Sequence, residues 1–115
     1  MDKNKLLLAT TVEHQLFDDT TVKCTLSMFQ LKRLASKNKS LYNLVTKVLT
    51  KGTEDIFEQI RVVYAAYVCA NMDSDDLMSE EEFTIMCGSD YVGVAETLGA
   101  LINPKKRKAS EDRSN

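Results

Sequence analysis

The sequence contains no pair of cysteines spaced for metal binding or for a disulfide framework. Its 115 residues include three cysteines, Cys24, Cys69 and Cys87, and none belongs to a C-x-x-C pair. An odd number of widely spaced cysteines argues against a zinc site and against a disulfide-stabilised fold. Cys69 and Cys87 stand among apolar neighbours, so we expect them to be small core residues in a reducing cytosol.

Catalytic groups are equally scarce. The chain has one histidine, His14, and it has no P-loop, no glycine-rich phosphate loop and no nucleophile elbow. A single histidine in a segment that alternates apolar and polar residues is more often a packed residue than a catalytic base or a metal ligand. The carboxylates between Asp73 and Glu82 have no partner groups with which to build an active site. We therefore expect a non-enzymatic protein without a cofactor.

Long apolar runs are absent as well. No run approaches the roughly 18 apolar residues of a membrane span, and the apolar stretch within Lys5–Ala9 is too short for a signal peptide. The sequence therefore predicts a soluble, intracellular protein that does not bind a membrane.

Charge is divided unevenly along the chain. Residues 104–115 carry five Lys/Arg and two Asp/Glu, and because the whole chain has a net charge of -2, residues 1–103 carry -5. The run Lys105-Lys106-Arg107-Lys108 resembles a nuclear localisation signal or a nucleic-acid patch. A helix that ends in cations before a disordered tail is the simpler interpretation. No basic face elsewhere extends a nucleic-acid footprint, so nucleic acid is not an expected partner.

Hydrophobic periodicity predicts one mainly α domain over residues 1–103. Within residues 1–26, the segments 12–16 and 21–26 alternate apolar and polar side chains on either side of a turn at Asp18–Thr20, which predicts a short β-hairpin. Helical spacing in residues 27–103 predicts a compact bundle of about five helices, followed by a disordered basic tail at 104–115. The helix between Thr53 and Asn71 is apolar around most of its circumference, so we expect it to be the buried hub.

Polar residues mark the expected helix starts. Gln30 and Glu82 each follow a serine by three residues, which is the spacing of a capping box. The predicted N-terminal caps are Ser27, Ser40, Thr53 and Ser79. Gly93 and Gly99 interrupt the last helix, which begins near Asp90. They either permit close approach to another helix or leave this helix loosely held.

The acidic loop after the hub helix has the spacing of a degenerate calcium loop. Counting from Asn71, the ligand positions 1, 3, 5 and 12 of an EF-hand are occupied by Asn71, Asp73, Asp75 and Glu82. Asp76 stands where the sharp turn needs glycine, and no second loop is present to pair with this one. We therefore expect no metal site. A single divergent EF-hand-type module that responds to calcium is the alternative interpretation.

Several segments of the chain, taken together, resemble a known family. The end of the hub helix, Ala66-Tyr67-Val68-Cys69-Ala70-Asn71, precedes the acidic loop and then Met78-Ser79-Glu80-Glu81-Glu82-Phe83. Phe29-x-Leu31-Lys32-x-Leu34 lies upstream, and Leu101-Ile102-Asn103-Pro104-Lys105-Lys106 closes the last helix. Together these segments resemble the tail assembly chaperones of long-tailed, siphovirus-type phages and prophages of Gram-positive bacteria.

The resemblance implies a late phage protein that binds the tape measure protein and keeps it soluble during tail tube assembly. The major tail protein is a further candidate partner, and a homo-oligomer is compatible with the sequence. Such a protein acts in the host cell cytoplasm and is absent from the mature virion.

A chaperone for a long amphipathic chain needs an apolar surface that accepts a partner helix. Methionine suits such an adaptable surface, although ordinary core filling explains at least two of the methionines. The candidate partner-binding residues are Met72, Met78, Phe83, Met86, Tyr91 and Leu98.

Overall fold

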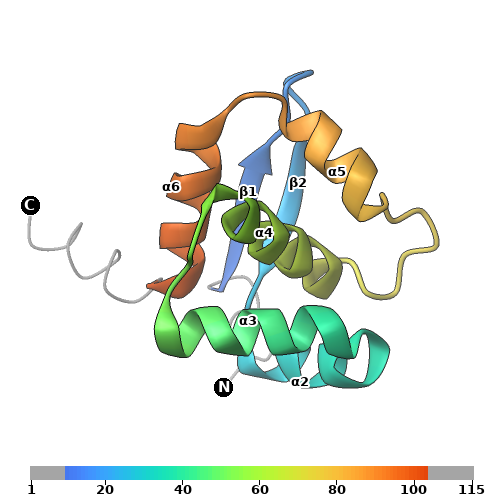
Figure 1. Cartoon of the computed structure of the whole chain (residues 1–115). Coiled ribbons are helices and arrows are strands. Elements are labelled where there is room, and N and C mark those ends of the chain that lie inside the picture. The colour runs from blue at the N-terminus through green and yellow to red at the C-terminus, as the bar shows by residue number, and fades with distance from the viewer. Residues whose placement is uncertain (1–9, 104–115) are drawn as a thin grey trace, which may run out of the picture.

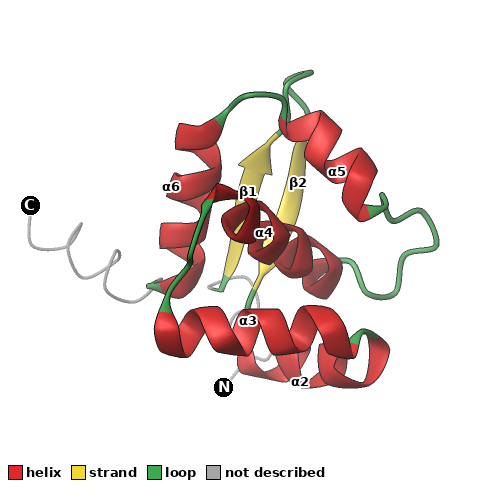
Figure 2. Cartoon of the chain, viewed as in Figure 1, coloured by secondary structure: helices red, strands yellow, loops and turns green. Residues whose placement is uncertain are grey.

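The described part of the chain consists of one β-hairpin and five helices. The structure is a computed structural model that describes residues 10–103, and its elements are shown in Figures 1 and 2. The predicted mainly α fold with an N-terminal hairpin is confirmed. The predicted tail at 104–115, and residues 1–9 of the predicted hairpin region, lie outside the described residues. In chain order the elements are β1 (Thr11–Gln15), β2 (Thr21–Thr25), α2 (Met28–Lys37), α3 (Lys39–Lys51), α4 (Ile56–Ala70), α5 (Glu80–Cys87) and α6 (Tyr91–Ile102).

The two strands pair in the antiparallel sense, and their alternation matches the sequence pattern. Val12 lies opposite Cys24 and His14 lies opposite Val22, so these four side chains share one face of the hairpin. Cys24 and His14 are buried there. β2 packs against α4, and β1 packs against α6. The hairpin is therefore one wall of the core, and its packing supplies the stability that an isolated hairpin lacks.

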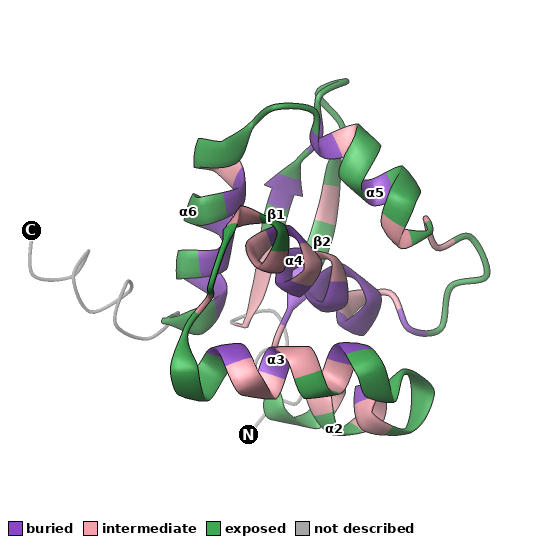
Figure 3. Ribbon diagram, in the orientation of Figure 1, coloured by how far each residue is buried: buried purple, intermediate pink, exposed green. Residues whose placement is uncertain are grey.

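α4 is the hub of the fold. It packs against β2, α2, α3, α5 and α6, and Figure 1 shows it among those elements. Figure 3 shows buried residues along most of its length, which confirms the prediction made from its apolar circumference. Its buried residues are Ile60, Val62, Val63, Ala65, Ala66, Tyr67, Val68 and Cys69.

Side-chain hydrogen bonds begin α2 and α5 at the predicted serines. At α5 the Ser79 hydroxyl accepts from the Glu82 N–H at 3.1 Å, and the Glu82 carboxylate accepts from the Ser79 N–H at 3.2 Å. This is a complete capping box. Ser27 caps α2, but its box stays open: the Ser27 N–H donates to the Thr25 hydroxyl, and the Gln30 side-chain oxygen accepts from Arg33, both at 3.2 Å.

The predicted caps of α3 and α4 are wrong. Asn38, not Ser40, caps α3, and Asp55, not Thr53, caps α4. Each side chain accepts from the backbone N–H three residues later, at 3.1 Å for Asn38 and 2.9 Å for Asp55. Asn and Asp are N-caps at least as good as Ser and Thr. Because these four residue types are similar as caps, the sequence alone does not rank two of them that lie within two residues of each other.

Candidate interaction surfaces

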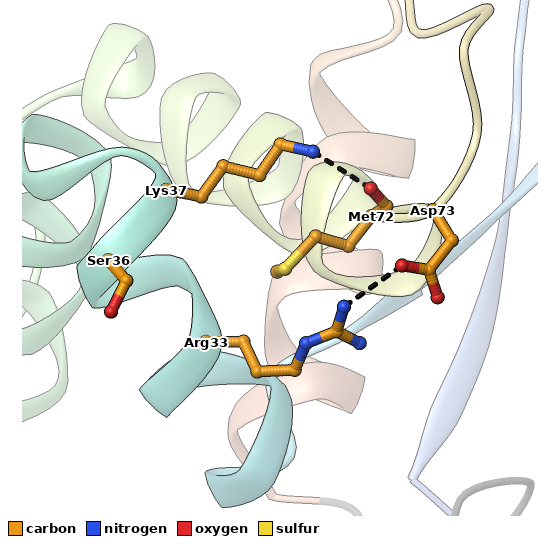
Figure 4. A pocket seen from close by; sticks show the side chains of 5 residues that line it. All are labelled: Arg33, Ser36, Lys37, Met72 and Asp73. Carbon is orange, nitrogen blue, oxygen red and sulfur yellow. Dashed lines mark hydrogen bonds and ion pairs between the residues drawn. The ribbon is translucent and has the colours of Figure 1, made fainter.

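The loop between α4 and α5 is held against α2 by two cations. The Arg33 guanidinium pairs with the Asp73 carboxylate at 2.9 Å, and the Lys37 ammonium donates to the Met72 carbonyl at 2.8 Å. Figure 4 shows both contacts, with the Met72 side chain between them and Ser36 on the α2 side. These five residues line a surface hollow of about 380 Å³. Arg33 and Lys37 therefore serve to hold the loop against α2, and neither is free to bind a ligand in this hollow.

Three of the four candidate calcium ligands are engaged in other contacts. The Asn71 amide donates to two backbone carbonyls, at 3.1 and 2.8 Å. Asp73 pairs with Arg33, Glu82 completes the cap of α5, and Asp75 is exposed. Within residues 10–103, no group of three or more His, Cys, Asp or Glu side chains is arranged to hold a metal ion. The calcium interpretation therefore has no geometric support.

Phe83 is the centre of an aromatic cluster that joins α4, α5 and the hairpin. It is fully buried, and its ring centroid lies 5.3 Å from that of Tyr67, 5.5 Å from that of Tyr64 and 6.0 Å from that of His14. The Tyr64 hydroxyl donates to the Met78 carbonyl, and the Tyr67 hydroxyl accepts from the Met78 N–H, both at 2.9 Å. Phe83 thus belongs to the core, where it is inaccessible to a partner in this conformation.

The six candidate partner-binding residues fall into two groups. Met72, Phe83 and Leu98 are buried, with at most 7% of their surface exposed. The others reach the surface: Met78 and Met86 are half-buried on either side of Phe83 in the sequence, and Tyr91 is exposed at the start of α6.

Two residues with exposed apolar side chains adjoin Met86 through the backbone, since Ile85 precedes it on α5 and Phe17 is hydrogen-bonded to it. Phe17 in the hairpin turn is 66% exposed and Ile85 on α5 is 63% exposed. The Phe17 N–H donates to the Met86 carbonyl at 2.9 Å, which holds the turn against the end of α5, as Figure 1 shows. We call Phe17, Ile85 and Met86 the α5 corner.

Sequence analysis missed Ile85 and Phe17. The signal for Ile85 was present, because Phe83, Met86 and Cys87 share the inward face of α5 and leave Ile85 on the opposite side. Phe17 carried no comparable signal, since a single aromatic residue in a turn has no periodicity.

α6 is buried on one side only. Leu98 and its neighbours on the inner side pack against β1 and α4. The exposed residues of α6 are Tyr91, Val92, Ala95, Glu96, Gly99 and Ile102. We call Val92, Ala95, Gly99 and Ile102 the outer α6 face; Glu96 and Tyr91 flank it.

The two glycines of α6 have different surroundings. A Cβ atom at Gly99 would meet nothing within 4 Å, so no helix of the described chain approaches it closely. At Gly93 the equivalent space is taken by the Asp90 carboxylate, which caps α6 by accepting from the Gly93 N–H at 2.9 Å. The close approach that the glycines suggested is therefore absent within residues 10–103.

An acidic hollow of about 320 Å³ lies between β1 and the first half of α6. Glu13, Asp90 and Glu96 line it, and no lysine or arginine does. His14 and Thr97 also line it, and the His14 Nδ1 atom lies 2.7 Å from the Thr97 hydroxyl oxygen in a buried contact. Burial lowers the pKa of His14, and the nearby Asp90 carboxylate opposes this shift only in part. The ring is therefore neutral at pH 7.

The three cysteines are buried and free. Burial raises the pKa of Cys24 and Cys69 to about 12 and that of Cys87 to about 11. All three thiols therefore stay protonated at neutral pH and cannot act as thiolate nucleophiles. The expectation that Cys69 and Cys87 are core residues is confirmed.

No single helix in residues 10–103 is long and apolar enough to cross a membrane. α5 and α6 satisfy that test of length and composition only as a pair, and the pair is bent by 118°. Comparison of the chain with protein-family models, with curated proteins and with solved structures finds no match.

Proposed function

We propose that this chain is a non-enzymatic binding protein whose partner is an amphipathic helix. Within that class we assign it as a phage tail assembly chaperone, which binds the tape measure protein and keeps it soluble while the tail tube assembles. The sequence resemblance from Ala66 to Phe83 supports this assignment. Its place of action is the host cell cytoplasm, it is absent from the mature virion, and the major tail protein is a second candidate partner.

The observation that carries the proposal is the α5 corner, which presents apolar side chains to solvent on a fixed support. The capping box at Ser79 holds the start of α5. The hydrogen bonds of Met78 with Tyr64 and Tyr67 of α4 hold the residue just before it. The Phe17 contact with Met86 holds the other end. A surface fixed at both ends loses little conformational entropy when a partner binds.

The chemistry of the corner favours an amphipathic helical partner. Phe17 and Ile85 supply exposed apolar area, and the half-buried Met86 supplies an adaptable side chain. Glu81 and Glu82 are exposed on the same helix. A helix with an apolar face flanked by Lys or Arg would complement both features.

The test is co-expression of the full chain with the tape measure protein encoded in the same genome. We expect the two proteins to co-purify in soluble form, and we expect Phe17→Ser and Ile85→Glu to reduce the yield of the soluble complex. Phe57→Ser is the matched control, because Phe57 is 68% exposed on α4, close to the 66% of Phe17. The control variant should retain the complex.

A wild-type chain that leaves the tape measure protein insoluble, and does not co-purify with it, would remove the chaperone assignment. Equal losses in Phe17→Ser and Phe57→Ser would move the binding site away from the α5 corner and leave the assignment without its structural support.

A further inference from the structure

The outer α6 face has the residue spacing of a helix-pairing seam. Val92, Ala95, Gly99 and Ile102 are separated by three, four and three residues, which is the a/d spacing of two heptads. Val92 is 69% exposed and Ile102 is 38% exposed. The only charged residue within α6 is Glu96. A solvent-facing seam of this kind, on a helix with almost no charge, is unusual for a surface that stays in water.

The sizes of the four side chains make the seam complementary to itself. Ala95 and Gly99 are small and occupy the middle, whereas Val92 and Ile102 are large and occupy the ends. In an antiparallel pair, Ala95 of one copy opposes Gly99 of the second copy, and Val92 opposes Ile102. The small residues then let the two backbones approach closely at the crossing, and the open space around Gly99 leaves room for it.

Charge selects the same orientation. Glu13, Asp90 and Glu96 surround the hollow beside the first half of α6, and within residues 10–103 none of them forms an ion pair. Antiparallel packing puts the uncharged second half of one α6 beside the acidic start of the other. Parallel packing would put like charges together.

We propose that two copies of this chain form a symmetric dimer through antiparallel contact of their outer α6 faces. The contact is isologous, because each seam meets the same seam of the other copy. The proposal is independent of the proposed function, since it uses α6 and not the α5 corner.

The first test is the mass of the full chain in solution, measured by light scattering and by analytical ultracentrifugation over micromolar to submillimolar concentrations. We expect a dimer of twice the 13.0 kDa chain mass. Gly99→Arg should give a monomer, because it places a charged side chain at the crossing. The open space at Gly99 and the gain in helix propensity should keep this variant folded, which its circular dichroism and melting temperature will show.

Asn43→Arg is the matched control, since it adds the same charge at an exposed position of α3, and it should remain dimeric. A wild-type chain that stays monomeric over the whole range overturns the proposal. A folded Gly99→Arg variant that dimerises like the wild type also overturns it.

The second test addresses orientation. Under mild oxidation the double variant Val92→Cys/Ile102→Cys should form a disulfide-linked dimer, because opposed seam positions can bring Cα atoms within the roughly 7 Å that a disulfide allows. The single variant Val92→Cys should cross-link far less. Efficient cross-linking of the single variant would mean parallel packing and would refute the antiparallel arrangement.

Discussion

Truncation of Phe83 should lower the stability of the fold far more than truncation of Ile85, although the two residues are only two positions apart on α5. Phe83→Ala should destabilise the fold strongly, because its side chain is fully buried at the centre of the aromatic cluster. Ile85→Ala should leave stability almost unchanged, because 63% of Ile85 is exposed. The pair therefore separates what α5 contributes to the core from what it offers to a partner.

The expected magnitudes follow from burial. Removing a fully buried phenylalanine side chain costs about 3–5 kcal/mol, which combines lost transfer free energy with the cavity left behind. For a domain of this size each kcal/mol lowers the melting temperature by about 4 °C, so Phe83→Ala should melt about 12–20 °C lower than the wild type. An exposed truncation such as Ile85→Ala should change the free energy of unfolding by no more than about 0.5 kcal/mol.

The assay is equilibrium urea denaturation followed by far-ultraviolet circular dichroism, with the denaturant slope compared among all variants. Phe83→Leu is the milder variant for use if Phe83→Ala does not fold. In the co-expression experiment, Ile85→Ala should weaken the complex while its folding stays intact. The reasoning about α5 is refuted if Ile85→Ala destabilises the chain as much as Phe83→Ala does, because that would place Ile85 in the core.

Three further outcomes are expected. His14 is the only histidine, and its folded-state pKa is lowered by burial, so the unfolded state takes up the proton first as pH falls. Urea denaturation should therefore show stability falling below about pH 6.5 with a slope of at most about 1.4 kcal/mol per pH unit, and His14→Gln should flatten this profile above the carboxylate range. Asn38→Ala should cost about 1 kcal/mol in the same assay, whereas Ser40→Ala should cost almost nothing; equal effects would contradict the cap seen at α3. Millimolar calcium should leave the melting temperature unchanged, because Asp73 is paired with Arg33, and a clear upward shift would restore the calcium interpretation.

Features that depend on neighbouring residues could be predicted from the sequence. The Ser79 capping box needs only side chains within one turn, and the structure contains it in full. The hub helix is similar, because its apolar circumference is a property of one segment. The alternation of Val12 and His14 predicted both the hairpin and its inward face.

Contacts between distant segments could not be predicted in this way. The Gln30 amide donates to the Cys69 carbonyl, 39 residues away, so a side chain predicted to cap its own helix instead joins α2 to α4. The Arg33–Asp73 pair spans 40 residues and gives the acidic loop a structural role that its calcium-like spacing did not suggest. Met72 and Phe83 were predicted to be candidate partner-binding residues, but both are buried, because other elements of the fold pack against them.

The two proposed surfaces lie on different helices, and this separation has a consequence for assembly. Figure 1 shows α5 and α6 on opposite sides of α4 and the hairpin. A dimer formed through the outer α6 faces would therefore leave both α5 corners exposed. A long helical partner with several apolar segments could then engage two corners at once, and the second contact would form at a high effective concentration. The Gly99→Arg variant, which should be a monomer, would still bind a single partner segment. It would lack the gain in affinity that two linked corners provide.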